Sequence, residues 1–167
     1  MNRQFIWVLC IVCIAIGIRS IYAVHSPLYL TTGDSVSYFL TAKKIIATKQ
    51  LVDPWRTPVY PLILSIPYSF VDQPLPDEIS GVYTIGLEYI RIAQSVSMVM
   101  ATVLLFLLCQ QLGIGRMMSA LLTLVGTSDF TLLLLEHTIV TESFACVWLV
   151  ILFYIQLQLL KKFTLFP

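Results

Sequence analysis

The sequence predicts an all-α integral membrane protein, with about four transmembrane helices and an outer loop of interfacial helices between the first and second spans. Three observations predict it. Hydrophobic residues make up 58% of the 167 residues and charged residues only 11%, whereas a soluble domain has about 25% charged residues. The mean hydropathy is +0.88. The apolar residues gather in runs near the roughly 20 residues that cross a bilayer as a helix.

The composition and the charge balance exclude several classes of protein. Lys and Arg together number 10, and Asp and Glu number 9, so the chain has no basic surface that would attract a nucleic acid. The apolar excess excludes an ordinary soluble domain and a disordered tail. We therefore interpret residues 1–167 as a single transmembrane domain.

The last three expected spans are separated by short links, residues 112–116 with two glycines and residues 136–139. Arg19 interrupts the first apolar run near its far end, where we expect its side chain to reach the membrane interface. The first run is interpreted as an uncleaved signal anchor. A cleaved signal peptide is the alternative, although the sequence lacks a good cleavage site. The spans are expected at residues 5–24, 90–111, 117–135 and 140–160.

The region of residues 25–89 is expected to lie at the outer membrane surface, and it holds most of the prolines and charges. Residues 58–71 are apolar but short and rich in proline, which predicts a helix at the interface or a re-entrant helix. Residues 35–48 have the pattern of an amphipathic helix that lies along a membrane. Its apolar face is predicted to comprise Val36, Phe39, Leu40, Ile46 and Ala47.

The distribution of charges predicts the orientation. With the N-terminus in the cytoplasm, the cations Arg3, Arg116, Lys161 and Lys162 fall on the inner side, and most acidic residues fall outside. The exceptions are four cations in the outer loop, Lys43, Lys44, Lys49 and Arg56. We expect them to contact anionic headgroups or to serve a function.

Cys10 and Cys13 form a C-x-x-C pair that a helix places on one face. Such a pair suits a redox site or half of a metal site, and it equally suits small apolar side chains in a lipid-buried helix. Because no second pair of ligands completes a metal site, we favour the apolar interpretation.

Acidic residues expected at the outer face are the candidates for chemistry. Asp34 either caps the surface helix or acts as a general base or metal ligand. Glu142 and Asp129 are costly in lipid unless they meet a partner or a wet cavity, and Glu136 lies between them in sequence. Arg56 either contacts a headgroup or binds a phosphate. These acids are expected to cluster, and an Asp34–Glu142 separation above about 20–24 Å would contradict a shared site.

An ordered set of segments resembles the GT-C glycosyltransferase superfamily, in the branch of the protein O-mannosyltransferases and the bacterial aminoarabinose transferases. One departure lies in the segment of residues 56–64, where Val59 replaces the glycine that the superfamily usually has. The matching segments are Gly17-Ile18-Arg19-Ser20 at the end of the first span, residues 33–42 (like G-D-S-x-x-Y-x-x-x-A), residues 56–64 (like R-x-P-G-Y-P-L-x-L), Arg91-Ile92-Ala93-Gln94 (like R-x-x-Q) and Thr141-Glu142-Ser143 (like S/T-E).

The resemblance implies transfer of a sugar from a polyprenyl-phosphate donor to an acceptor hydroxyl, with inversion, at the outer face of a bacterial inner membrane. Asp34 would be the base or lie beside a divalent Mg²⁺ or Mn²⁺, and Glu142 is the second catalytic candidate. Some members of the family work without metal, so the ion is an open question. The candidate substrate-binding residues are Arg56 for the donor phosphate, Tyr38, Tyr60, Lys43 and Lys44, of which the two lysines match no motif.

Members of the superfamily usually run to several hundred residues, so the chain is expected to be the N-terminal portion of a longer fold. Such a portion is expected to be inactive when it is alone. Two other functions are considered. One is a small non-catalytic membrane subunit that contacts a membrane-protein partner through its spans. The other is a transporter component in which Asp129, Glu136 and Glu142 line a pathway.

Overall fold

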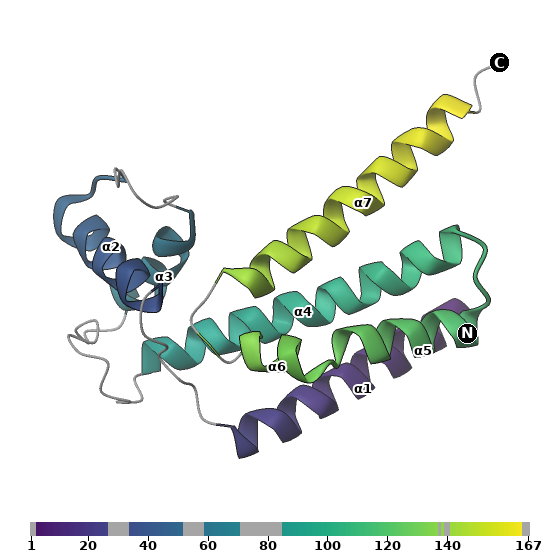
Figure 1. The fold of residues 1–167 in the computed structure, drawn as a ribbon, viewed down its shortest axis with the longest axis horizontal. Helices are drawn as coiled ribbons and strands as arrows, with labels where there is room; N and C mark the ends of the chain where they lie inside the picture. The colour runs from purple at the N-terminus through teal and green to yellow at the C-terminus, as the bar shows by residue number, and fades with distance from the viewer. Residues whose placement is uncertain are drawn as a thin grey trace.

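The computed structural model of the chain describes residues 3–26, 34–51, 59–70, 85–136, 138 and 141–164, and it is α-helical with no strand among them (Figure 1). The helices are α1 (Arg3–His25), α2 (Asp34–Thr48), α3 (Val59–Phe70), α4 (Ile85–Gln111), α5 (Arg116–Thr127), α6 (Phe130–Glu136) and α7 (Glu142–Thr164).

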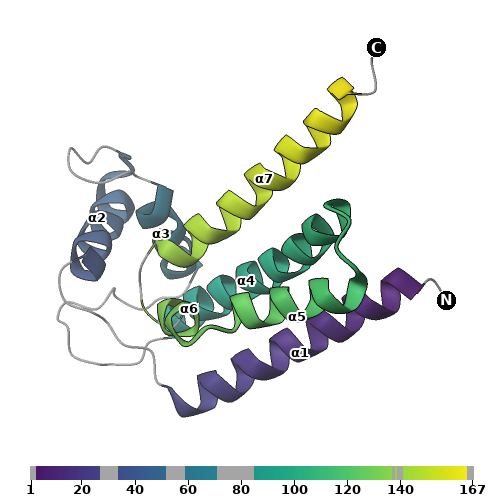
Figure 2. The ribbon, with the colours of Figure 1, turned by 45° about the vertical axis from the view of Figure 1, so that its right-hand side comes forward.

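Three of the described helices are long and apolar enough to cross a membrane: α1, Glu88–Gln111 of α4 and Glu142–Lys161 of α7. They cover the first, second and fourth expected spans. The central helix is α4, which contacts α1, α3, α5, α6 and α7. Figures 1 and 2 show α1 and α5 along one side of α4, while α7 packs on α4 and ends beyond the bundle.

The third expected span is broken. In place of one helix over residues 117–135, α5 and α6 meet at a bend of 58°, so this pair is a fourth span only if a bent helix counts as one. The cause is local, because the Asp129 carboxylate accepts a hydrogen bond from the backbone N–H of Thr131 at 2.9 Å. An aspartate that caps a new helix in this way competes with continuation of the preceding helix.

At one end of the bundle, α2 packs against α3, and α3 contacts α4 (Figure 1). The prediction of a short helix over residues 58–71 is confirmed, since α3 has 12 residues and keeps Pro67 within it. The core between these helices comprises Tyr38, Phe39 and Ala42 of α2, Tyr60, Leu64 and Tyr68 of α3, and Ile90 of α4.

The predicted helix over residues 35–48 is confirmed, but its predicted apolar face is partly wrong. Phe39 is buried as expected, whereas Leu40 is 60% exposed. The buried stripe lies around Tyr38, Ala42 and Ile45. The reason is that α2 packs on α3, so the face that matches the aromatic side chains of α3 is covered instead of the face with the highest hydropathy.

The opposite end of the bundle carries the cations predicted to share one side of the membrane. Arg3 begins α1 and Arg116 begins α5 at this end (Figure 1). Lys161 near the end of α7 donates from Nζ to the carbonyl of Gln111, which ends α4, at 3.3 Å. This grouping agrees with the expected topology, and the assignment of this end to the cytoplasm stays a prediction.

Candidate functional site

Three candidate residues, Tyr38, Tyr60 and Glu142, come together where α2 and α3 meet the start of α7. The ring centroids of Tyr38 and Tyr60 are 5.0 Å apart in an edge-to-face arrangement, and those of Tyr60 and Phe144 are 5.9 Å apart. The Glu142 carboxylate is near enough to act electrostatically on the Tyr60 hydroxyl. We call Tyr38, Tyr60, Glu142 and Phe144 the Tyr60 cluster.

The Tyr60 hydroxyl is a buried hydrogen-bond donor. Tyr60 is 3% exposed, and its hydroxyl has no hydrogen-bond partner among the described residues. Burial, and after it the neighbouring Tyr38 and Glu142, raise the pKa of this phenol far above its ordinary value. The hydroxyl therefore stays protonated at physiological pH, and an acceptor oxygen on a ligand would satisfy it.

Glu142 lies in the first turn of α7 and is exposed. The Thr141 hydroxyl approaches its Oε2 atom at 3.5 Å. A carboxylate in the first turn of a helix is favoured by the helix dipole, and exposure lets it keep its hydration. The cost expected for an acid in lipid is avoided by this placement at the helix end.

The other candidates lie outside this cluster or outside the described residues. Asp34 begins α2, but its side chain is outside the described part, as is all of Arg56. The expected proximity of Asp34 to Glu142 therefore stays a prediction. Lys43 is half-buried and Lys44 is exposed. At 3.6 residues per turn, both lie on faces of α2 other than that of Tyr38.

Arg19 does not reach the membrane interface as expected, and that prediction is wrong. Its side chain is 3% exposed and forms a two-pronged ion pair with Glu136, which is fully buried. Nε donates to Oε2 at 2.9 Å, and Nη2 donates to Oε1 at 2.8 Å. Arg19 points inward because it continues the buried stripe of α1 formed by Ile11 and Ala15.

The guanidinium of Arg19 also donates a hydrogen bond to a backbone carbonyl at the break between α5 and α6. In a continuous helix the carbonyl of Thr127 would accept the N–H of Thr131, but that N–H bonds to Asp129 instead. Arg19 Nη2 donates to the Thr127 carbonyl at 3.0 Å. An unpaired buried carbonyl costs about 1–3 kcal/mol on general grounds, so the hydrogen bond from Arg19 stabilises the bend.

Glu136, one of the acids expected to cluster at the outer face, is buried against Arg19. Asp129 is exposed and caps α6. Glu142 belongs to the Tyr60 cluster. Each of the three acids thus has its own surroundings.

Gln94, which the sequence analysis treated only as part of a motif, joins α4 to the start of α7. It is fully buried, and its Nε2 donates to the carbonyl of Thr138 at 3.2 Å and to the hydroxyl of Ser143 at 2.8 Å. The available signal was an amide near the outer end of an apolar run. Buried amides in membrane helices commonly bond across to other helices.

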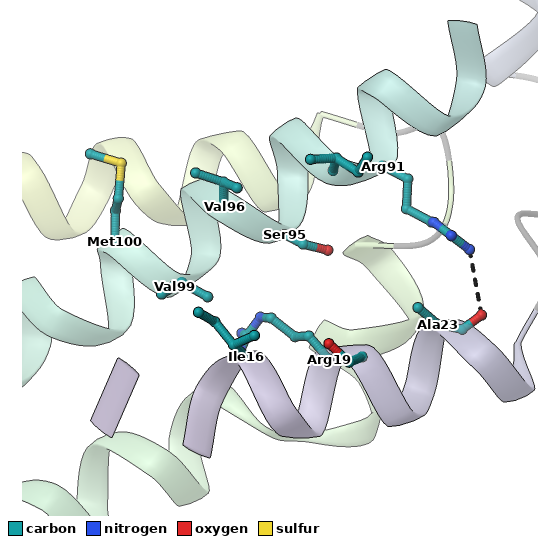
Figure 3. A pocket seen from close by; sticks show the side chains of 10 residues that line it. Ile16, Arg19, Ala23, Arg91, Ser95, Val96, Val99 and Met100 are labelled. Carbon is teal, nitrogen blue, oxygen red and sulfur yellow. Dashed lines mark hydrogen bonds between the residues drawn. The ribbon is translucent and has the colours of Figure 1, made fainter. Parts of the chain in front are cut away.

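A groove of about 390 Å³ lies between α1 and α4, with apolar walls interrupted by Arg19 and Arg91 (Figure 3). Arg91 points across to α1, where Nη1 lies 3.5 Å from the carbonyl of Ala23, and its Nη2 pairs with Glu88 at 2.7 Å. Both guanidinium groups are thus already matched by carboxylates. A second groove, of about 490 Å³, separates α3 from α4 and is lined by Ile63, Ile66, Pro67, Phe70, Tyr89, Ile90 and Ala93.

Among the described residues no group of three or more His, Cys, Asp or Glu side chains is placed to hold a metal ion. Cys10 and Cys13 are exposed free cysteines on α1. A divalent ion at Asp34 stays a prediction, since that side chain lies outside the described part.

No family model, no curated protein and no solved structure matches this chain. The resemblance to the GT-C superfamily therefore rests on the sequence segments named above.

Proposed function

We propose that this chain carries the outer-face site of a membrane glycosyltransferase that moves a sugar from a polyprenyl-phosphate donor to an acceptor hydroxyl. One observation carries the proposal. The helix that begins at Asp34 and the turn that holds Glu142 are far apart in sequence, and they are linked in space through Tyr38, Tyr60 and Phe144. The segments of residues 33–42 and 141–143 thus meet at Tyr60, whose buried hydroxyl is a hydrogen-bond donor.

In the proposed reaction, Asp34 accepts the proton of the acceptor hydroxyl as that oxygen attacks the anomeric carbon. The bond from this carbon to the donor phosphate breaks, and the phosphate leaves with the electron pair. Because the acceptor oxygen attacks from the face opposite the phosphate, the configuration inverts. Arg56 is proposed to bind the phosphate, where a cation stabilises the developing charge. The protonated hydroxyl of Tyr60 offers one further donor to a sugar or phosphate oxygen.

The apolar groove between α3 and α4 supports a lipid-linked donor. Ile90 lines this groove and also belongs to the core that holds Tyr60, so the groove lies next to the Tyr60 cluster. A donor whose headgroup reached the cluster would keep its isoprenoid tail on the apolar side. Because such a tail passes from lipid to an apolar groove, its binding there depends on van der Waals packing and not on removal from water.

The test is a transfer assay in lipid nanodiscs with a panel of polyprenyl-phosphate sugars. Asp34→Asn is expected to lower kcat by about 10²–10⁴-fold, the usual contribution of a general base. Asp53→Asn is the matched control, since Asp53 belongs to the same expected outer region but not to the proposed site, and it should keep wild-type activity. Equal activity in Asp34→Asn and wild type would refute the proposal.

The alternative of a non-catalytic membrane subunit has one observation in its favour. Only 11% of the spanning window of α7 is buried, and Trp148, Leu152 and Phe153 are exposed on it. Such a face suits contact with another membrane helix as well as with lipid. A subunit predicts that changes on this face impair partner binding, and that Asp34→Asn has no effect on any transfer.

A further inference from the structure

The segment between α6 and α7 is tied to other helices on both sides. At its start, Glu136 ends α6 and pairs with Arg19 of α1. Further on, the carbonyl of Thr138 and the hydroxyl of Ser143 both accept hydrogen bonds from the single amide group of Gln94 on α4. The point at which α7 begins is therefore fixed by Gln94.

The start of α7 carries two members of the Tyr60 cluster. Ser143 lies between Glu142 and Phe144, so a shift of Ser143 moves both of them. Phe144 is the contact from α7 to the ring of Tyr60 and packs on the core of α2 and α3. Position at this turn thus sets how Glu142 faces Tyr60.

The same face of α4 also holds α2 and α3. Ile90, one helical turn before Gln94, is 2% exposed and belongs to the core of the α2–α3 pair. One short stretch of α4 therefore locates both sides of the cluster, with Ile90 on the side of Tyr60 and Gln94 on the side of Glu142.

We propose that Gln94 is a positioning residue, which holds the first turn of α7 so that Glu142 and Phe144 face Tyr60. It acts through Ser143 and the carbonyl of Thr138 and touches no reacting group. This inference rests on the proposed function only in treating Glu142 as a site residue. The geometric part stands or falls by itself.

The geometric test is cross-linking of Tyr60→Cys with Phe144→Cys by a short bismaleimide, after the four native cysteines are replaced by serine. Gln94→Leu removes the amide at similar size. Loss of buried hydrogen bonds should favour displaced positions of the turn. We expect the cross-linking rate to fall by about tenfold, which corresponds to about 1.4 kcal/mol.

Two controls separate displacement from misfolding. Met98→Leu alters the next turn of the same buried face without removing a polar group, and it should keep the wild-type rate. A second cysteine pair, Phe106→Cys with Ala120→Cys, reports on the core at the other end of the bundle. If Gln94→Leu abolishes both the 60–144 and the 106–120 cross-links, the variant has misfolded, and the milder Ser143→Ala replaces it as the test. Ser143→Ala should lower only the rate of the 60–144 cross-link, and Ser143→Thr, which keeps the hydroxyl, should retain the wild-type rate.

An unchanged 60–144 rate in both Gln94→Leu and Ser143→Ala overturns the inference, whatever the activity. In the transfer assay, Gln94→Leu should lower kcat and leave the KM for the donor unchanged, because the proposed phosphate contact at Arg56 is untouched. If the cross-linking result holds while Asp34→Asn transfers sugar like wild type, then the proposed function fails and the positioning stands.

Discussion

Breaking the buried ion pair between Arg19 and Glu136 should be among the most destabilising single changes in the chain. Glu136→Leu leaves a guanidinium that is 3% exposed and has two carbonyl partners among the described residues, Ala15 at 3.3 Å and Thr127 at 3.0 Å. An uncompensated buried charge of this kind costs about 3–5 kcal/mol. Arg19→Met should cost a similar amount, because it strands the carboxylate and also removes the donor to Thr127.

The double variant gives the sharper expectation. Arg19→Met combined with Glu136→Leu removes both charges, and replacing a buried ion pair by apolar side chains is often neutral or stabilising. The remaining cost is the carbonyl of Thr127, which loses its donor at the break between α5 and α6. An unsatisfied buried group costs about 1–3 kcal/mol. The double variant should therefore be more stable than either single variant.

The measurement is the free energy of unfolding in mixed micelles, followed by far-ultraviolet circular dichroism as the fraction of denaturing detergent rises. The four proteins form a double-mutant cycle, in which neighbouring groups give a coupling energy and independent ones do not. Additive losses, with the double variant as unstable as the sum of the two single variants, would refute the ion pair.

Two further predictions concern single groups. Asp129→Ala should lower the free energy of unfolding by about 1 kcal/mol, because α6 loses the side chain that caps it. Asp129→Asn should keep the cap and the stability. Equal losses of stability in the two variants, measured in the same unfolding assay, would contradict this prediction. Tyr60 has a raised pKa in the folded chain, so above its ordinary value of 10.0 the unfolded chain releases a proton that the folded chain retains. Stability should therefore fall with rising pH by up to about 1.4 kcal/mol per pH unit, and Tyr60→Phe should show a smaller fall over the same alkaline range.

Several elements could be predicted because their causes are local. Runs of apolar residues identify α1, α4 and α7 as helices suited to a membrane. Short length and proline identify α3 as an apolar helix shorter than the expected spans. The bend at Asp129 was missed although its cause is also local, because hydropathy does not record the capping of a helix by an aspartate within an apolar run.

The candidate site could be predicted only in part. Tyr38, Tyr60 and Glu142 were named from motif segments, and the structure brings them together. The R-x-x-Q segment does not predict the role of Gln94, since its partners at positions 138 and 143 lie in a different part of the chain. A motif shows which residue types occur in order, and it does not show which of them share a hydrogen bond.

Hydropathy and backbone preference act within a few residues, so the amino-acid sequence is enough to predict a helical chain with segments apolar enough to span a membrane and a polar, proline-containing region between the first two. The contacts of its polar groups depend on how the helices pack. Arg19 and Glu136 are 117 residues apart, and each looked like an interfacial charge when considered alone. Burial makes an unpaired charge so costly that the two must meet once the helices pack, and that packing depends on the whole set of side chains.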